Sequence, residues 1–448
     1  MSDNAFIFES CAFDAPRGVL TFNYAFADGP AFEEQIVVGT PARTLGAAGT
    51  AALQSAIRLL YLLAGVSYYK AFVPPRLECR AFALDAELAA FVTKVYEKGL
   101  AEFAFRNELD LGGRINFRTE EAPQPPAQRL QLARRALVPV GGGKDSIVSI
   151  ECLRAMGEEM SLFVLASPGN IPQPIADSIA VSGLPHIHAA RTISPALIEL
   201  NKQPGTYNGH IPITAIVSAT ALVCAILHGY DTVVLSNERS ASAPNLSLGA
   251  HEINHQYSKS FEFETDLAAY VHKRISPDLA YFSLLRPLSE CEIARRFAKL
   301  RAYHPVFRSC NTAFRQDPAK RGTNWCCDCP KCRFVFLALA PFVPKAELIG
   351  IFGQDMLDAP SQMEGFAELA GLSLHKPFEC VGEIEESALL LRQARRMPEW
   401  SNDKVVASLG ARLEMNAPDF AANYRKLFEF ADEHAVPPRY LEGLHACG

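Results

Sequence analysis

A run of glycines followed by two charges and a hydroxyl is the clearest chemical signal in the sequence. The run is Gly141, Gly142, Gly143, Lys144, Asp145 and Ser146; an apolar stretch precedes it and a helical pattern follows. Glycines let the backbone approach an anion, and amides at a helix N-terminus stabilise negative charge. Lys144 adds a mobile cation. We predict a phosphate-binding turn; the alternative is a glycine-rich turn without a ligand.

Two familiar phosphate-binding motifs do not fit this run. A Walker A loop ends in Gly-Lys-Ser/Thr after four intervening residues, whereas Lys144 is followed by Asp145 and no suitably placed earlier glycine exists. A dinucleotide fingerprint needs close packing of the helix on the strand, and the charged Lys144-Asp145 pair suits that packing badly. The predicted phosphate site is therefore of another kind.

Five of the twelve cysteines lie in one segment, and their spacing suggests a metal. Cys326, Cys329 and Cys332 follow one another at intervals of three, and Cys310 lies sixteen positions upstream. In a reducing compartment such a cluster favours metal over disulfide, and four thiolates form a closed, structural zinc site. Cys327 could replace Cys326 as a ligand. The alternative is a set of reduced packing cysteines.

A polar segment at residues 236–260 carries most of the remaining candidate groups. It contains an acid, two bases, an imidazole and a phenol, together with an amide: Glu238, Arg239, Lys259, His255, Tyr257 and Asn237. It follows a predicted strand, and ligands of open parallel sheets bind beyond the carboxyl ends of the strands. We expect this segment to face the glycine run, with Asn237 and Arg239 at the nucleotide. The alternative is a polar surface loop with a helix cap.

Strands and helices must alternate to position these groups. Strands are predicted at residues 137–140, 162–166, 186–188, 232–235 and 281–285, and helices at 145–156, 174–181 and 211–227. This alternation predicts an α/β fold with a parallel, doubly wound sheet. Residues 1–125 predict an α+β domain with helices at 51–63 and 88–95. Residues 126–345 form the predicted nucleotide-binding domain, and residues 346–448 a mainly helical region with helices at 383–395 and 423–433.

Composition excludes several classes of protein. The chain has 448 residues, 49% of them hydrophobic and 21% charged, which is typical of a globular protein and not of a disordered or fibrous one. A net charge of −6 gives no global basic field, so neither nucleic acid nor a membrane surface is expected as a partner. No signal-peptide pattern is visible, and polar residues interrupt the apolar stretch 211–227, so we expect a cytoplasmic protein.

The glycine run resembles the PP-loop of the ATP-pyrophosphatase superfamily, whose usual form is Ser-Gly-Gly-X-Asp-Ser, with Gly141 in place of the first serine. Residues 283–293 resemble the last strand of that superfamily and the helix after it. The resemblance implies a PP-loop fold that cleaves ATP between its α and β phosphates, attaches AMP to a carboxylate or carbonyl oxygen and releases pyrophosphate. Mg²⁺ prefers carboxylate and phosphate oxygens, and our candidate ligands for it are Asp145 or, as an alternative, Glu238.

Several motifs together resemble the UDP-N-acetylmuramoyl-L-alanyl-L-glutamate epimerase family along most of the chain. They are residues 67–72, 208–212, 237–242, 254–260, 329–332 and 376–382. The resemblance implies inversion of the terminal L-glutamate of UDP-MurNAc-L-Ala-L-Glu, with ATP and Mg²⁺. Inversion needs acid/base groups on both sides of the α-carbon. The candidates are His255, Tyr257, Lys259, Glu238 and Cys380, and the sequence does not choose between them.

Three other functions are compatible with the sequence. A PP-loop ligase or amidotransferase would transfer the adenylated group to an amine. A nucleobase-modifying relative would share the zinc cysteines, although such enzymes usually carry a basic surface. A module that binds ATP without turning it over would keep the glycine run and lose the chemistry.

Overall fold

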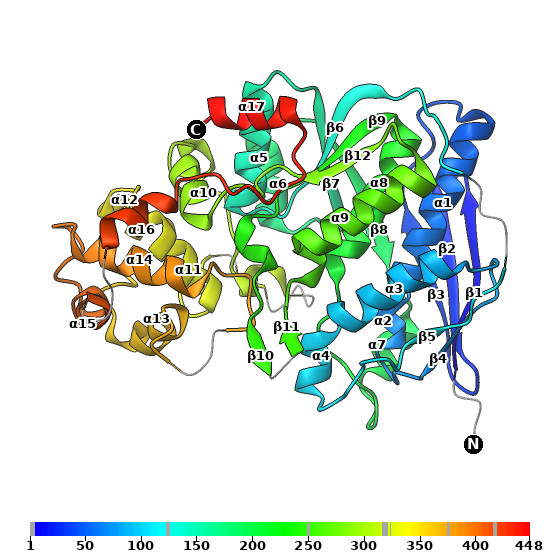
Figure 1. Cartoon of the computed structure of the whole chain (residues 1–448), viewed down its shortest axis with the longest axis horizontal. Coiled ribbons are helices and arrows are strands. Elements are labelled where there is room, and N and C mark those ends of the chain that lie inside the picture. Colours follow the sequence, from blue (N-terminus) through cyan, green and yellow to red (C-terminus); the bar gives the residue numbers. More distant parts are fainter. Residues whose placement is uncertain are drawn as a thin grey trace.

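A computed structural model describes residues 5–121, 126–248, 251–315, 321–322, 324–373, 377–414 and 419–448. Lys376, the first residue of one resembled motif, lies outside them. A single ten-stranded sheet in the order β12-β9-β6-β7-β8-β3-β2-β1-β4-β5 is the central feature. Figure 1 shows this sheet with helices packed around it and a separate group of helices from the C-terminal part of the chain.

Five parallel strands form one half of the sheet. They are β6 (Ala133–Pro139), β7 (Met160–Ala166), β8 (His186–Thr192), β9 (Tyr230–Leu235) and β12 (Ala280–Ser283). Each predicted strand of this region overlaps one of them. Numbered along the chain these strands lie in the order 3-2-1-4-5, so the order reverses between β6 and β9. That reversal is where open α/β sheets bind ligands.

Helices cover both faces of the parallel strands, because successive side chains of a strand point to opposite faces. Ala136 and Val138 of β6 belong to one core with α5 (Lys144–Ala155), α6 (Gln173–Ser182) and α10 (Glu290–Phe297). Leu137, between them, belongs to the other core, with α1 (Gly46–Ala64), α8 (Ile213–His228) and α9 (Phe261–Tyr270). The predicted α/β architecture with a largely parallel sheet is confirmed.

The N-terminal strands extend the same sheet. β1 (Ala5–Asp14), β2 (Val19–Phe26) and β3 (Ala31–Val37) form an antiparallel meander, and β1 pairs parallel with β4 (Arg76–Cys79), which pairs with β5 (Asn116–Phe117). The helices α2 (Val66–Tyr69), α3 (Ala86–Gly99), α4 (Ala101–Arg106) and α7 (Pro195–Leu200) flank this half. β3 pairs antiparallel with β8. At this joint the buried Arg191 guanidinium makes two 2.9 Å hydrogen bonds to Glu34 and one of 2.9 Å to Ser67.

The most apolar helical segment belongs to the core. Residues Gly46–Tyr69, which span α1 and α2, are long and apolar enough to cross a membrane, with a mean hydropathy of 1.3, but 72% of the apolar window is buried inside the protein. α1 packs against α8, the helix predicted at residues 211–227. The apolar character of both helices is therefore explained by mutual burial.

The C-terminal region is helical, as expected. Its helices are α11 (Pro330–Leu339), α12 (Lys345–Phe352), α13 (Met363–Leu369), α14 (Ile384–Arg395), α15 (Lys404–Glu414), α16 (Phe420–Lys426) and α17 (Pro438–Ala446). The predicted helix at 383–395 is confirmed, whereas the one at 423–433 ends at Lys426. Beyond that point the backbone bonds to the sheet domain instead, since Ala431 N donates to Pro287 O at 2.8 Å.

A disulfide fixes the end of the chain to the helix that follows the glycine run. Cys152 on α5 pairs with Cys447, next to the end of α17. In Figure 1 α17 lies directly beside α5. The cysteine count predicts no disulfide scaffold, and this one bond joins segments 295 residues apart in the sequence.

Candidate active site

The three glycines of the run lie at the carboxyl end of β6 and meet different surroundings. Gly142 has a φ of +73°, a left-handed backbone that favours glycine, and a Cβ there would lie 3.0 Å from the backbone of Pro174. A Cβ on Gly143 would lie 2.7 Å from Ser309 Oγ, while nothing lies within 4 Å of one on Gly141. The turn is therefore enclosed by the start of α6 and by the segment around Ser309.

The N-terminus of α5 is suited to an anion. Gly143 is its N-cap, and no side chain caps this helix end in the part of the chain that the structure describes. The first amides of a helix have no partner within it and carry partial positive charge. Ser146 Oγ donates to Gly143 O at 3.2 Å, so the serine hydroxyl lies at the same turn. These amides are therefore available to an anion, and phosphate binding at this turn stays a prediction.

Lys144 is fixed, where the sequence suggested a mobile cation. It is buried, and its ammonium contacts the carboxylates of Asp145 and of Glu290 on α10. Burial opposes its charge, but the two carboxylates outweigh burial and raise the pKa of Lys144. Burial raises the pKa of Glu290. The pairing leaves the Asp145 side chain one-third exposed at 33%, so this carboxylate can still reach a ligand.

The segment after β9 lies at the same edge of the sheet as the glycine run, as expected. Asn237 Nδ2 donates to Ser283 Oγ at 3.0 Å and so joins the ends of β9 and β12. Glu238 is 7% exposed, and its backbone oxygen accepts a 2.6 Å hydrogen bond from Arg286. Arg239 begins the short helix η1 (Arg239–Ser242). These three residues flank the reversal of strand order between β6 and β9.

Three of the five acid/base candidates meet in a second cluster. His255 Nδ1 shares a hydrogen bond with Glu102 on α4, and Lys259, at the end of η2 (Tyr257–Lys259), donates to Cys380 Sγ at 3.4 Å. The ring of His210 lies 4.3 Å from that of His255. Glu102 was not among the sequence candidates, because a glutamate on a short helix is ordinarily a solvated one.

Neighbouring groups shift the pKa values of the ionisable side chains in this cluster in opposite directions. Burial raises the pKa of Cys380, but Lys259, Lys331 and His255 outweigh burial and lower that pKa to about 6. Burial lowers the pKa of His255, but its hydrogen bonds with Cys380 and Glu102 raise it to about 9. Burial and the neighbouring His255 lower the pKa of His210 to about 4. At neutral pH the cluster therefore holds a thiolate and an imidazolium.

Contacts from distant segments hold Cys380 in place. The ring of Phe378 lies 5.6 Å from that of Phe105 on α4. Asn311 Nδ2 donates to Glu379 Oε1 at 2.6 Å. The segment carrying the thiol is thus fixed on one side by the N-terminal half of the sheet and on the other by the cysteine-rich segment.

Tyr257 has a different environment from the other candidates. Its ring lies 6.1 Å from that of Phe263 on α9, and the Lys98 ammonium lies 5.6 Å from its centre. Within the described residues its hydroxyl has no hydrogen-bond partner. Burial raises the pKa of Tyr257. These two contacts of the ring are with α9 and α3.

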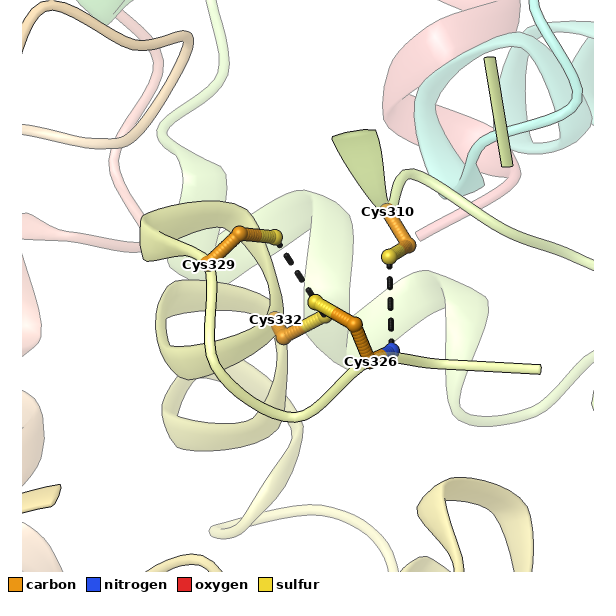
Figure 2. A group of neighbouring side chains, drawn as sticks. All are labelled: Cys310, Cys326, Cys329 and Cys332. Carbon is orange, nitrogen blue, oxygen red and sulfur yellow. Dashed lines mark hydrogen bonds between the residues drawn. The ribbon is translucent and has the colours of Figure 1, made fainter. Parts of the chain in front are cut away.

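The four predicted zinc ligands come together, as Figure 2 shows. The sulfurs of Cys310, Cys326, Cys329 and Cys332 all lie within 4.8 Å of one another, with Cys326 at 3.7 Å and Cys329 at 3.4 Å from Cys332. Zinc–sulfur bonds of about 2.3 Å give an edge of about 3.8 Å in a tetrahedron, so the spacing fits zinc. The sulfur of Cys327 instead bonds Phe352 O at 3.3 Å.

The cysteine cluster also supports the glycine turn. Cys310 follows the segment in which Arg308 N donates to Gly142 O at 2.9 Å. Cys329 is the N-cap of α11, and Cys332 lies in the first turn of that helix. The cluster thus joins α11 to the segment that closes over Gly142 and Gly143.

The strand order and the glycine turn at its reversal define a three-layer α/β protein, of the class in which ligands bind beyond the carboxyl ends of the parallel strands. The chain belongs to the MurL family. The MurL N-terminal domain matches residues 1–284, a range that includes the whole ten-stranded sheet, and the MurL C-terminal domain matches residues 306–424.

Three relatives that match nearly the whole chain share one name. The UDP-N-acetyl-alpha-D-muramoyl-L-alanyl-L-glutamate epimerase of Xanthomonas oryzae pv. oryzae is 43% identical over 443 residues, covering 99% of this chain and 97% of the relative. Proteins of that name from Micromonospora sp. and Salinispora tropica are each 43% identical and cover 98% of this chain, over 98% and 95% of their own lengths. The name denotes an isomerase. No solved structure matches the chain.

Proposed function

We propose that the protein converts the terminal L-glutamate of UDP-MurNAc-L-Ala-L-Glu to D-glutamate, using ATP and Mg²⁺ and releasing AMP and pyrophosphate. The observation that carries this proposal is the 43% identity, over nearly the whole chain, to relatives named for epimerisation of this substrate. The substrate is a muramoyl peptide, so the reaction would serve peptidoglycan precursor synthesis.

The ATP phosphates would bind at the turn formed by residues 141–146, as in the PP-loop superfamily. The uncapped N-terminus of α5 and the left-handed Gly142 support this assignment. Asn237 and Arg239 would complete the nucleotide site from the end of β9. The partly exposed Asp145 carboxylate would hold Mg²⁺, which prefers hard oxygen ligands.

Activation of the substrate explains why an epimerase would consume ATP. A free carboxylate makes the neighbouring α-hydrogen very weakly acidic, because removing that proton would place a second negative charge beside the first. Adenylation neutralises the carboxylate and gives the electron pair an acceptor. A side-chain base can then take the α-proton, and hydrolysis after inversion frees the product.

Zinc would bind the four clustered sulfurs and stabilise the fold. The closed set of thiolates leaves no coordination position for water, which is the arrangement of structural rather than catalytic zinc. Bound zinc would tie α11 to the segment that encloses the glycine turn. The orientation of the Cys327 sulfur toward Phe352 favours Cys326 as the ligand.

The test is incubation of the purified protein with ATP, Mg²⁺ and UDP-MurNAc-L-Ala-L-Glu in D₂O. Proton NMR follows the glutamyl α-hydrogen, and a parallel assay follows AMP and pyrophosphate. We expect loss of the α-signal, recovery of D-glutamate after acid hydrolysis, and AMP only when substrate is present. AMP without α-exchange would indicate a ligase or amidotransferase instead. ATP binding without AMP would indicate a module that has lost turnover.

A further inference from the structure

Segments far apart in the sequence bring a thiol, an imidazole, an ammonium and a carboxylate together. Glu102 comes from α4, His255 and Lys259 from the loop and η2 after β11 (His251–Ile253), and Cys380 from the chain before α14. Cys380 accepts from Lys259 at 3.4 Å, and His255 Nδ1 hydrogen-bonds Glu102. The carboxylate is 5% exposed and the imidazole 15%.

We propose that Cys380 is the base that removes the α-proton of the activated glutamyl group, and that Glu102 is a positioning residue that keeps His255 protonated beside the thiolate. This assignment rests on the proposed function, because the α-proton becomes removable only once the carboxyl group is activated. It selects one of the five candidate groups and adds Glu102, which the sequence motifs do not contain.

The charges around the thiol support its role as a base. Lys259, Lys331 and His255 face Cys380, and they lower its pKa to about 6 in spite of burial. A base works best when its pKa lies near the operating pH, so this thiolate is formed at neutral pH and is still basic enough to accept a proton. Lys259 is the weaker candidate, because the thiolate raises the pKa of Lys259 and keeps it protonated.

Glu102 acts on the thiol through the imidazole. It accepts the Nδ1 proton of His255 and also pairs with Arg106. Although burial opposes ionisation, the bond with His255 lowers the pKa of Glu102, so it remains an anion. The neighbouring His210 has a pKa lowered to about 4 and adds no charge at neutral pH.

The proton transfer balances without an additional reagent. The Cα–H bond breaks, an S–H bond forms on Cys380, and the electron pair moves onto the carbonyl oxygen of the activated carboxyl group. The carbanion then takes a solvent-derived proton on its opposite face, and the Cys380 thiol returns its proton to solvent. The result is inversion at the α-carbon with no net oxidation or reduction.

The first experiment separates activation from proton removal in the Cys380→Ala variant. Pyrophosphate release in a single turnover should stay within about threefold of wild type, while α-hydrogen exchange in D₂O should fall by about 10²-fold or more, the usual contribution of a general base. Cys79→Ala on β4 is the matched control and should leave both rates unchanged. The assignment is wrong if Cys380→Ala still exchanges the α-hydrogen at the wild-type rate.

The second experiment tests the positioning role with Glu102→Gln. The rate of α-exchange in wild type should rise with pH as Cys380 ionises near pH 6. Without the Glu102 carboxylate His255 holds its proton less strongly, so this rising limb should move toward the ordinary thiol value of 9.0. Glu199→Gln, in an exposed pair with Lys202, is the control. A limb that stays near pH 6 in Glu102→Gln would overturn the positioning role, even if the rate is reduced.

A third measurement needs neither ATP nor substrate. Iodoacetamide alkylation of the Cys380 peptide, followed by mass spectrometry against pH, should have a midpoint near 6 in wild type and a higher one in His255→Gln. A wild-type midpoint near 9 would refute the thiolate. Wild-type protein that alkylates as expected but releases no pyrophosphate would instead refute the proposed function, so the two failures are distinguishable.

Discussion

Replacing the three consecutive glycines one at a time by alanine should give three different results, although the chemical change is the same. At Gly141 the added methyl group meets nothing within 4 Å, so the free energy of unfolding should change by less than about 0.5 kcal/mol. At Gly142 the backbone has a φ of +73°, which costs an alanine about 1–2 kcal/mol. The methyl group would also lie 3.0 Å from the backbone of Pro174, which cannot rotate away.

Gly143→Ala should be destabilising because of a steric clash that a second substitution can remove. Its backbone suits any residue, with φ −94° and ψ 172°, and the obstacle is Ser309 Oγ at 2.7 Å. Overpacking of this kind typically costs about 1–3 kcal/mol. Removing the hydroxyl with Ser309→Ala leaves Arg308 O and the Cβ of residue 309 as the nearest neighbours of the new methyl group, both at 3.9 Å. The double variant should therefore recover most of the stability that Gly143→Ala loses.

Urea unfolding of the purified variants, followed by circular dichroism, measures this series without ATP. The expected order of stability is Gly141→Ala, then Gly143→Ala, then Gly142→Ala, and Ser309→Ala should rescue Gly143→Ala but leave Gly142→Ala unchanged. Equal losses at Gly141 and Gly142, or an absence of rescue at Gly143, would refute the account of how the turn is enclosed.

Three further predictions concern other parts of the molecule. Glu34→Ala should cost about 3–5 kcal/mol in urea unfolding, because it leaves a buried arginine unpaired at the joint between the two halves of the sheet; a loss below 1 kcal/mol would contradict this. Metal analysis should find about one zinc per chain in Cys327→Ser and none retained in Cys326→Ser; the reverse result would make Cys327 the ligand. Burial raises the pKa of Glu386 to about 7, so the folded protein binds an extra proton between about pH 4.5 and 7 and its stability should fall as pH rises through that window. Glu386→Gln should remove this dependence, which urea unfolding at several pH values would measure.

The parallel half of the sheet could be predicted because its signals are local. Each strand is a short apolar run followed by a helix of suitable length, and the glycine turn marks where the first helix begins. The joint between β3 and β8 had no such signal, since Glu34 and Arg191 lie 157 positions apart. The extension of the helix beyond Lys426 was wrong, because a backbone hydrogen bond to Pro287 competes with the helix there.

The site was predictable to the extent that its residues have distinctive types. Cys380, His255 and Lys259 could be named from the sequence, and the structure brings them together. Glu102 and Glu290 could not, because a glutamate on a helix is usually solvated and the sequence alone does not show that its partner is buried beside it. Each of these glutamates can be recognised as part of the site only from the fold, which places a cationic side chain against its carboxylate.

Lys259 explains how the glycine turn and the thiol could act on one substrate. The carboxyl carbon that would be adenylated and the α-carbon that would lose its proton are bonded neighbours, so the two sites must lie close together. The Cys380 thiolate raises the pKa of Lys259 most, burial opposes this, and Glu238 and Asp145 raise it further. A single ammonium therefore interacts both with the carboxylates near the glycine turn and with the thiolate. That shared cation is the physical link that an enzyme coupling activation to proton removal requires.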